Sequence, residues 1–243
     1  MASVAALTLV ILWALVGCQA STSSTGASAS VVQPQPTSVT ALPSGAAASS
    51  VDATLAELVD RLVVSPEHLD GYERDLFPHW TDDDGDGCNT RYEVLLAEAI
   101  VAPSVSGTCD VTGGMWLSSY DGVEINDAGG VQIDHLVALA EAWYSGAFSW
   151  TTDQRERFAN DLGVPWALNA VSPDANQAKG SDDPAEWLPP RPSALCPYVE
   201  AWVGMKVRWN LTIDPAEEEA LETLALGCPE SRITVPLGVP STF

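Results

Sequence analysis

Positive charge is scarce in this 243-residue sequence, which has 10 Lys and Arg, 33 Asp and Glu and a net charge of -23. No charged residue precedes Asp52. Because phosphate binding normally rests on a basic surface, this balance argues against a general affinity for polyanions. A division between residues 130 and 131 leaves 3 bases and 17 acids before it, and 7 bases and 16 acids after it. The charges are therefore -14 and -9, and the second part repels phosphate less.

A hydrophobic run long enough to span a bilayer comfortably is also missing. The longest run, from Val4 to Val16, is followed by small residues, which is typical of an export signal. Residues 15–18 (Leu-Val-Gly-Cys) resemble a lipobox, in which Cys18 would be lipidated. An ordinary signal peptide and an uncleaved anchor remain alternatives, since no Lys or Arg lies near Met1. We expect residues 1–20 to be a signal peptide with a lipobox.

The next segment lacks both charge and periodicity. Residues 21–51 are dominated by Ser, Thr, Ala, Val, Pro and Gln, which predicts a disordered linker. We expect one domain over residues 52–243.

The cysteines lack any Cys-x-x-Cys pair, which disfavours a zinc finger. Apart from Cys18 there are four, and an even number in an exported protein indicates two disulfides. Three pairings are possible. We favour Cys88 with Cys109 and Cys196 with Cys228, because each bond then closes a compact unit.

Helical and strand patterns both follow the linker, which predicts an α+β fold. Apolar residues at helical spacing predict a helix that begins near residue 55, through Leu55, Leu58, Val59, Leu62 and Val63. Further helices are expected at 93–101, 138–145, 151–160 and 215–227, and short strands at 109–125. We expect five tryptophans to lie in the core: Trp143, Trp150, Trp166, Trp202 and Trp209.

An acidic loop over residues 82–93 matches the twelve-residue calcium-loop pattern. Its acids Asp82, Asp84 and Asp86 occupy positions 1, 3 and 5, with Gly87 at position 6 and Glu93 at position 12. We expect a structural Ca²⁺ site here. The alternative is a solvated acidic turn.

Two segments bring together the side chains of a candidate catalytic site. Val131 to Val137 is a short apolar strand that ends on Asp134 and His135. Leu168 to Gly180 is a second strand followed by a helix, with Asn169, Asn176 and Lys179. One imidazole, one carboxylate, amides and an ammonium at this spacing point to metal-dependent phosphodiester hydrolysis.

These motifs resemble the HNH nucleases (ββα-metal, or His-Me finger), in particular secreted bacterial HNH endonucleases like the GmrSD C-terminal domain. The resemblance spans residues 72–228 and includes Asp-Ile-Asp-His, Phe-Ala-Asn-Asp and Trp-Leu-Pro-Pro. It implies an HNH ββα-metal core embedded in a mostly helical, disulfide-stapled domain.

The resemblance also implies a role for each site residue. His135 is the expected general base, and Asp134 and Asn176 are the expected ligands of Mg²⁺ or Mn²⁺. Lys179 would contact phosphate, while Asn169 and Asn160 would brace the loop around His135. The family tends to have Asp-Lys where this chain has Ser181-Asp182, so one positive charge is missing beside the expected phosphate site.

We therefore expect an exported endonuclease, anchored to the membrane only through a lipid or released, that acts on nucleic acid, with DNA favoured. Two alternatives remain open. One is a catalytically inactive calcium-binding surface lipoprotein with an HNH-like fold, and the other is a disulfide-bonded interaction module.

Overall fold

The computed structural model describes residues 50–238. The predicted signal peptide, the lipidation site Cys18 and residues 21–49 of the predicted linker lie outside the described residues. Seven α-helices and four two-stranded antiparallel sheets make up the described chain, so the α+β expectation is confirmed.

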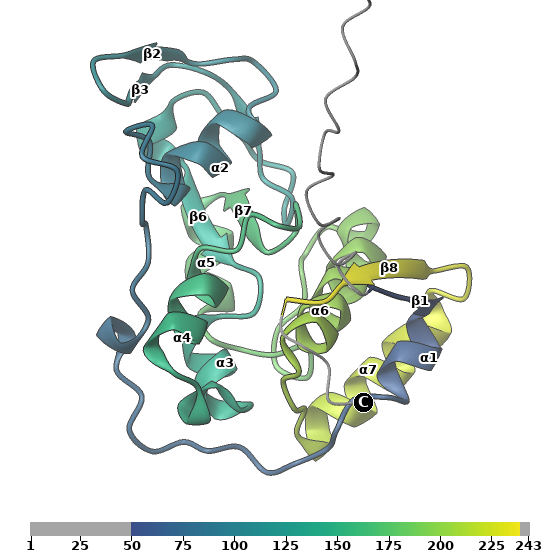
Figure 1. Cartoon of the computed structure of the whole chain (residues 1–243). Helices are drawn as coiled ribbons and strands as arrows, with labels where there is room; N and C mark the ends of the chain where they lie inside the picture. The colour runs from purple at the N-terminus through teal and green to yellow at the C-terminus, as the bar shows by residue number, and fades with distance from the viewer. Residues whose placement is uncertain (1–49, 239–243) are drawn as a thin grey trace, which may run out of the picture. The chain divides into compact units, whose positions relative to one another are not determined.

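A ββα unit lies at the centre of the described chain (Figure 1). Strands β6 (Gln132–His135) and β7 (Leu168–Val171) form a two-stranded antiparallel sheet. Helix α5 (Pro173–Lys179) follows directly and packs against β6. Its start is well specified, because Ser172 caps the N-terminus by accepting a hydrogen bond from the Ala175 N–H, and Pro173 occupies the first turn. The sequence therefore predicted this unit correctly.

The larger hydrophobic core surrounds α6 (Leu195–Trp209). Helices α1 (Leu55–Val59) and α7 (Pro215–Gly227) pack against α6, and so does the sheet of β1 (Ser50–Thr54) and β8 (Arg232–Pro236). Helices α3 (Leu139–Tyr144) and α4 (Thr152–Ala159) contribute residues to the same core. Of the tryptophans expected there, Trp143, Trp202 and Trp209 are buried, whereas Trp150 and Trp166 are partly buried.

A smaller core lies on the other side of the β6–β7 sheet. Helix α2 (Thr90–Glu98) covers it and contributes Val94 and Leu95. The short hairpins β2–β3 (Ser104–Ser106 and Asp110–Thr112) and β4–β5 (Trp116–Leu117 and Glu124–Ile125) adjoin it. Ile133 and Ala170, which face each other across β6 and β7, belong to this smaller core. The sheet therefore separates two cores and is held from both sides.

Buried charges tie α6 to its neighbours. Lys206 is fully buried, and its ammonium lies 2.5 Å from Glu141 and 3.1 Å from Glu217. Arg208 pairs with Asp161 at 2.6 Å. Since removing one partner of a buried pair leaves an uncompensated charge, these contacts fix how α3, α6 and α7 pack.

Both predicted disulfides are present. Cys88 bonds to Cys109 and Cys196 bonds to Cys228, the sequence-local pairing. In the chain-entropy model, closing loops of 21 and 32 residues contributes about 3 kcal/mol each.

Several boundaries differ from the sequence expectation. β1 begins at Ser50, so Ser50 and Val51 belong to the folded domain and not to the linker, because they pair with Pro236 and Val235. α1 ends at Val59, and the chain continues in tight turns that leave Val63 exposed. α2 begins at Thr90, earlier than expected, since Asn89 caps its N-terminus.

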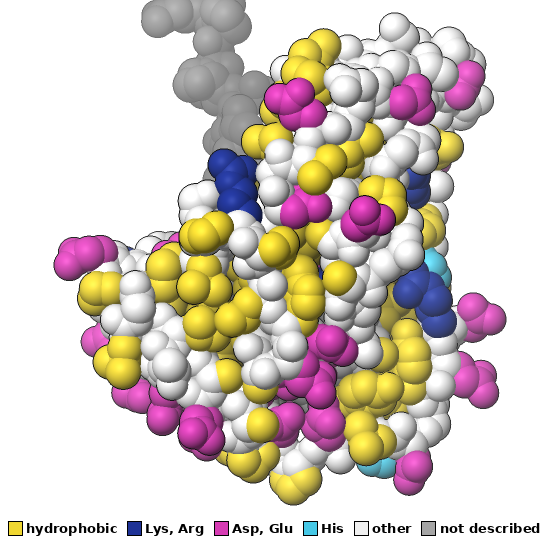
Figure 2. Space-filling view, turned by 180° about the vertical axis from the view of Figure 1, so that it is seen from behind, with side chains coloured by type: hydrophobic (Ala, Val, Ile, Leu, Met, Phe, Trp, Pro, Cys, Tyr) yellow, Lys and Arg dark blue, Asp and Glu magenta, His cyan; other side chains and the backbone are white. Residues whose placement is uncertain are grey.

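No helix within residues 50–238 combines the length and the apolar character that a membrane-spanning segment requires. Figure 2 shows one face of the molecule, on which Lys and Arg side chains form small separate groups among scattered acidic side chains.

Candidate active site

His135 ends strand β6 and is buried. Its Nε2 lies 2.8 Å from the carbonyl oxygen of Ala159, the last residue of α4. A carbonyl oxygen only accepts hydrogen bonds, so Nε2 carries the proton and Nδ1 has the free lone pair. Burial lowers the pKa of His135 to about 3, and the positive charges of Arg74 and Lys179 add to this effect. The imidazole is therefore neutral at physiological pH.

The position of Ala159 depends on α4, whose ends are both specified by local contacts. The Thr151 hydroxyl accepts from the Gln154 N–H, and the Gln154 side chain bonds back to Thr151, which forms the predicted capping box. At the other end, Asn160 accepts from the Thr81 N–H and the Thr90 hydroxyl. Its amide donates to the Pro78 and Glu156 carbonyls. Asn160 thus braces α4 against residues 78–90.

Trp80 covers one side of His135. Their ring centroids lie 5.3 Å apart with an interplanar angle of 31°. Trp80 has a φ of 61°, a left-handed conformation that is strained for a bulky residue. Such strain is typical of functional sites, and here it brings the indole over the imidazole.

Asp134 is buried beside His135 but points to different partners. Its Oδ2 accepts a 2.7 Å hydrogen bond from the Tyr120 hydroxyl and lies 2.9 Å from Nζ of Lys179. Burial raises the pKa of Asp134, while Lys179 opposes the rise. This alternation of neighbours along a strand is expected, and both residues nevertheless border one cavity.

Lys179 does not present its ammonium to solvent. The side chain is fully buried, and Nζ also donates to the His135 carbonyl at 3.1 Å. The structure thus places the predicted phosphate-binding lysine in an internal ion pair. Here it fixes the carboxylate and the backbone of the Asp134–His135 pair.

A cavity of about 280 Å³ joins His135 and Asp134 to Asn176 of α5. The amide nitrogen of Asn176 lies 2.6 Å from Oε1 of Gln132. Arg74 of the 3-10 helix η1 (Arg74–Leu76) also lines this cavity and is exposed. Arg74 lies in no motif of the sequence, and Gln132 lies in the predicted strand without an expected role, so only their tertiary positions indicate a function.

Asn169 lies away from this cavity. It faces Asp134 across the β6–β7 sheet, and its amide donates to the Trp166 carbonyl at 3.0 Å. Asn169 thus braces the loop before β7, whereas Asn160, next to the His135 acceptor Ala159, braces the loop around His135.

The donor set around the cavity suits a hard cation. Asp134 supplies a carboxylate and Asn176 an amide oxygen, the ligand types that Mg²⁺ and Mn²⁺ prefer, while Gln132 accepts from the Asn176 amide nitrogen. Oδ1 of Asp134 receives one bond, from Lys179 at 3.1 Å, so a lone pair remains for a cation. These residues therefore fit a metal that takes its other ligands from water and substrate.

The acidic loop forms a second cluster of oxygen donors. Carboxylate oxygens of Asp82, Asp84 and Asp86 lie within 4.8 Å of one another. Gly87 has a φ of 96°, which the turn at the sixth loop position requires. Burial raises the pKa of Glu93, and the negative charges of Asp84 and Asp86 add to the rise.

The order of strand, strand and helix around the buried His135 agrees with the resemblance to HNH nucleases. A family comparison points to a nuclease-related class. The family model of the GmrSD restriction endonucleases, C-terminal domain, matches residues 109–224. The chain belongs to this family, as predicted from its motifs. The matched region includes β6, β7, α5 and all of the ββα site residues.

A relative supports a wider similarity. An "Uncharacterized secreted protein" of Arthroderma benhamiae is 44% identical over 176 residues, which cover 72% of this chain and 85% of that protein. No solved structure matches the chain.

Proposed function

We propose that this domain hydrolyses phosphodiester bonds of nucleic acid, with His135 as the general base. The observation that carries the proposal is the hydrogen bond from Nε2 of His135 to the Ala159 carbonyl. This bond fixes the tautomer and leaves Nδ1 free to accept a proton from the attacking water. Burial keeps the ring neutral before the reaction.

The Ala159 carbonyl has a second role once the proton has moved. The Ala159 oxygen lies 2.8 Å from Nε2 of His135. Its partial negative charge would stabilise the imidazolium that forms when Nδ1 accepts a proton. Arg74 lines the same cavity and has no carboxylate partner within residues 50–238, so its guanidinium is available to bind the phosphate.

Asp134 and Asn176 would hold the divalent cation, with Mg²⁺ or Mn²⁺ as the cofactor. When bound, such a cation polarises the phosphate and offsets negative charge on the leaving oxygen. Lys179 and Tyr120 orient the Asp134 carboxylate from the interior, and Gln132 orients the Asn176 amide. Each expected ligand thus has a supporting residue behind it.

The test is nicking of supercoiled plasmid, and cleavage of single- and double-stranded DNA and RNA, with Mg²⁺ or Mn²⁺. His135→Ala should lower the rate by about 10²–10⁴, the usual contribution of a general base. His135→Gln can place an amide N–H near the Nε2 position and controls for loss of the Ala159 contact. His68→Ala is the matched control, because His68 is exposed and stacks on Phe148. Equal rates for His135→Ala and wild type would refute the assignment.

The acidic loop supports a second proposal, a structural Ca²⁺ held by Asp82, Asp84, Asp86 and Glu93. Convergence of three of these carboxylates favours it. If all nuclease assays are negative but Ca²⁺ binds, a catalytically inactive calcium-binding protein becomes the better assignment.

We also propose that the protein is exported, and that Cys18 carries a lipid. Support comes from the apolar segment near Met1, the two disulfides and the relative that is described as secreted. Cys18→Ser should release the protein from the membrane fraction. A wild-type protein found wholly in the soluble fraction would exclude the anchor.

A further inference from the structure

The net charge of -23 raises the question of where a polyanion can approach this protein. Six of the ten basic residues are already engaged. Lys179, Lys206 and Arg208 form buried ion pairs, and Arg232 pairs with Asp52. The remaining two donate to backbone carbonyls, Arg91 to Val131 and Arg155 to three residues.

Four arginines have neither a carboxylate partner nor a bond to a backbone carbonyl within residues 50–238: Arg61, Arg74, Arg157 and Arg191. Two of them line cavities at the β6–β7 sheet. Arg74 borders the His135 cavity, and Arg191 borders a separate one. Two of the four available arginines therefore lie at cavities next to the β6–β7 sheet, whereas Arg61 lines a cavity beside α6.

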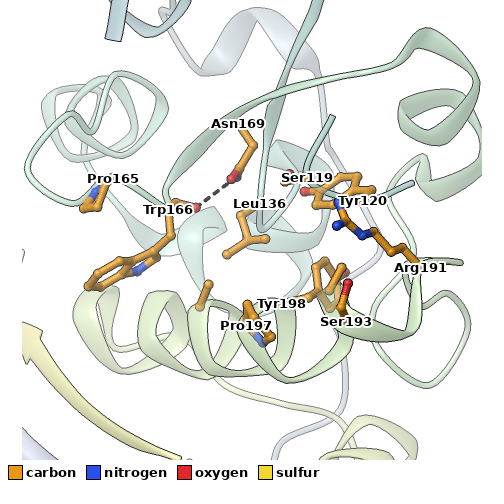
Figure 3. A pocket seen from close by; sticks show the side chains of 12 residues that line it. Ser119, Tyr120, Leu136, Pro165, Trp166, Asn169, Arg191, Ser193, Pro197 and Tyr198 are labelled. Carbon is orange, nitrogen blue, oxygen red and sulfur yellow. Dashed lines mark hydrogen bonds between the residues drawn. The ribbon is translucent and has the colours of Figure 1, made fainter. Parts of the chain in front are cut away.

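The Arg191 cavity has a volume of about 370 Å³, within the range of roughly 300–1,000 Å³ that holds small molecules. None of its twelve lining residues is acidic, although the chain has more than three acids for each base. Figure 3 shows Trp166 on one side of Leu136 and Arg191 on the other, with Asn169 between them. The cavity is thus mostly apolar, with the Arg191 guanidinium at one end and the Trp166 indole at the other.

Arg191 is held at this position by its neighbours. Its backbone N–H donates to the Tyr120 carbonyl at 3.3 Å. Its guanidinium lies across Gly122, where a Cβ would come within 3.1 Å of Nη1. Gly122 has a φ of 75°, so glycine both permits the turn and leaves room for the arginine. Asp121, which precedes Gly122, accepts hydrogen bonds from the Ser172 hydroxyl and the Val123 N–H.

The cavity adjoins the His135 site through two direct links. The Tyr120 ring lines the cavity, while its hydroxyl lies 2.7 Å from Asp134. Asn169 lines the cavity as well and pairs with Asp134 across the sheet. Asp134 thus borders the His135 cavity and contacts or pairs with two residues that line the Arg191 cavity, so the two cavities are neighbours.

We propose that this cavity binds one nucleoside monophosphate unit beside the scissile phosphodiester, a proposal that rests on the nuclease function above. Arg191 binds the phosphate of this unit. Trp166 provides a flat apolar surface for the base, and Oδ1 of Asn169 accepts from a base N–H, since only the amide nitrogen of Asn169 is engaged. The substrate is single-stranded, because a base inside a duplex cannot enter the cavity.

The charge inventory also fixes the salt dependence. Two free arginines at the site correspond to about two phosphate contacts, so log K should fall by roughly 1.4 per log unit of salt for a single strand. A basic nucleic-acid-binding face with 6–10 contacts would give a much steeper slope.

The experiment measures binding by calorimetry and by NMR titration of the full chain with the four 5′-mononucleotides, inorganic phosphate and adenosine. We expect mononucleotides to bind, with phosphate alone and adenosine at least tenfold weaker. Arg191→Gln should weaken mononucleotide binding at least tenfold, without a change in melting temperature because Arg191 is exposed. Arg157→Gln, an exposed arginine of α4 away from both cavities, is the matched control and should bind as wild type.

Trinucleotides distinguish a strand subsite from a site for free nucleotides. With His135→Ala, which slows cleavage, a trinucleotide should bind tighter than a mononucleotide and compete with it. Equal affinity for the two would overturn the strand subsite, and equal losses in Arg191→Gln and Arg157→Gln would overturn a specific role for Arg191.

The two proposals fail in different ways. A wild-type protein that cleaves nucleic acid but binds no mononucleotide refutes the subsite alone. Arg191-dependent binding of mononucleotides without any cleavage supports the cavity as a nucleotide site and refutes the nuclease function.

Discussion

The ammonium of Lys179 lies 2.9 Å from a carboxylate oxygen of Asp134, and the Lys179 side chain is fully buried. The same ammonium donates to the His135 carbonyl. One lysine thus positions both the expected metal ligand and the expected base from the interior. Its removal would leave a buried carboxylate without a counter-charge.

Lys179→Ala should therefore act first on stability. Breaking a buried pair costs about 3–5 kcal/mol, and denaturant unfolding measures this loss. Lys179→Met combined with Asp134→Asn removes both charges and should recover much of the stability. Arg157→Ala, an exposed substitution, is the control and should change the free energy of unfolding by less than about 0.5 kcal/mol. A stable Lys179→Ala with only a raised KM would instead indicate phosphate binding.

The low pKa of His135 predicts an unusual pH profile. An unperturbed histidine loses its basic form as pH falls through about 6.5. Burial lowers the pKa of His135 to about 3, so kcat/KM, which reports the free enzyme, should not fall through a histidine titration between pH 7 and 5. Rates measured over this range with saturating Mn²⁺ test the prediction. A titration near 6.5 that vanishes in His135→Asn would contradict it.

Glu98 should make stability depend on pH in the opposite sense to an ordinary carboxylate. Burial raises its pKa to about 7, and the Ala170 N–H bonded to it only partly offsets this. A raised folded-state pKa contributes stability that is complete below the unfolded value near 4.3 and is lost as pH rises through 7.

Glu98→Gln should therefore be more stable than wild type at pH 8 and lose this advantage at pH 5. The difference should be up to about 3 kcal/mol, since one pKa unit corresponds to about 1.4 kcal/mol. Glu222→Gln, which is exposed on α7, is the matched control and should follow wild type. Parallel curves for Glu98→Gln and wild type would show that Glu98 does not titrate in this way.

Calcium should stabilise the acidic loop. A ligand that binds only the folded state adds about 2.7 kcal/mol at a concentration of 100 Kd, so the melting temperature should rise with Ca²⁺. Asp84→Asn should abolish this rise. Asp83→Asn is the matched control, because Asp83 is not one of the three converging carboxylates. If Ca²⁺ does not change the melting temperature of the wild-type protein, the loop is a solvated acidic turn and not a calcium site.

The sequence by itself determined the features that depend on near neighbours in the chain. The capping box of Thr151 and Gln154, the Pro173 start of α5 and the Asp214 cap of α7 each depend on side chains within three or four residues. The order of strand, strand and helix around His135 and Asn176 also follows from local patterns, whereas the sequence only favoured the pairing of Cys88 with Cys109 among three possible pairings.

Only the tertiary structure decided what each site side chain contacts. Lys179 shares a helix with Asn176, yet the packing of α5 against β6 buries its ammonium beside Asp134. Ala159 follows His135 by 24 residues, and the intervening chain folds back so that the Ala159 carbonyl contacts the imidazole. The Arg191 N–H donates to the carbonyl of Tyr120 in the 118–123 turn, which places Arg191 at the cavity next to the β6–β7 sheet. Burial and long-range hydrogen bonds fix these contacts. The local spacing of residues cannot predict them, because the partners are distant in sequence.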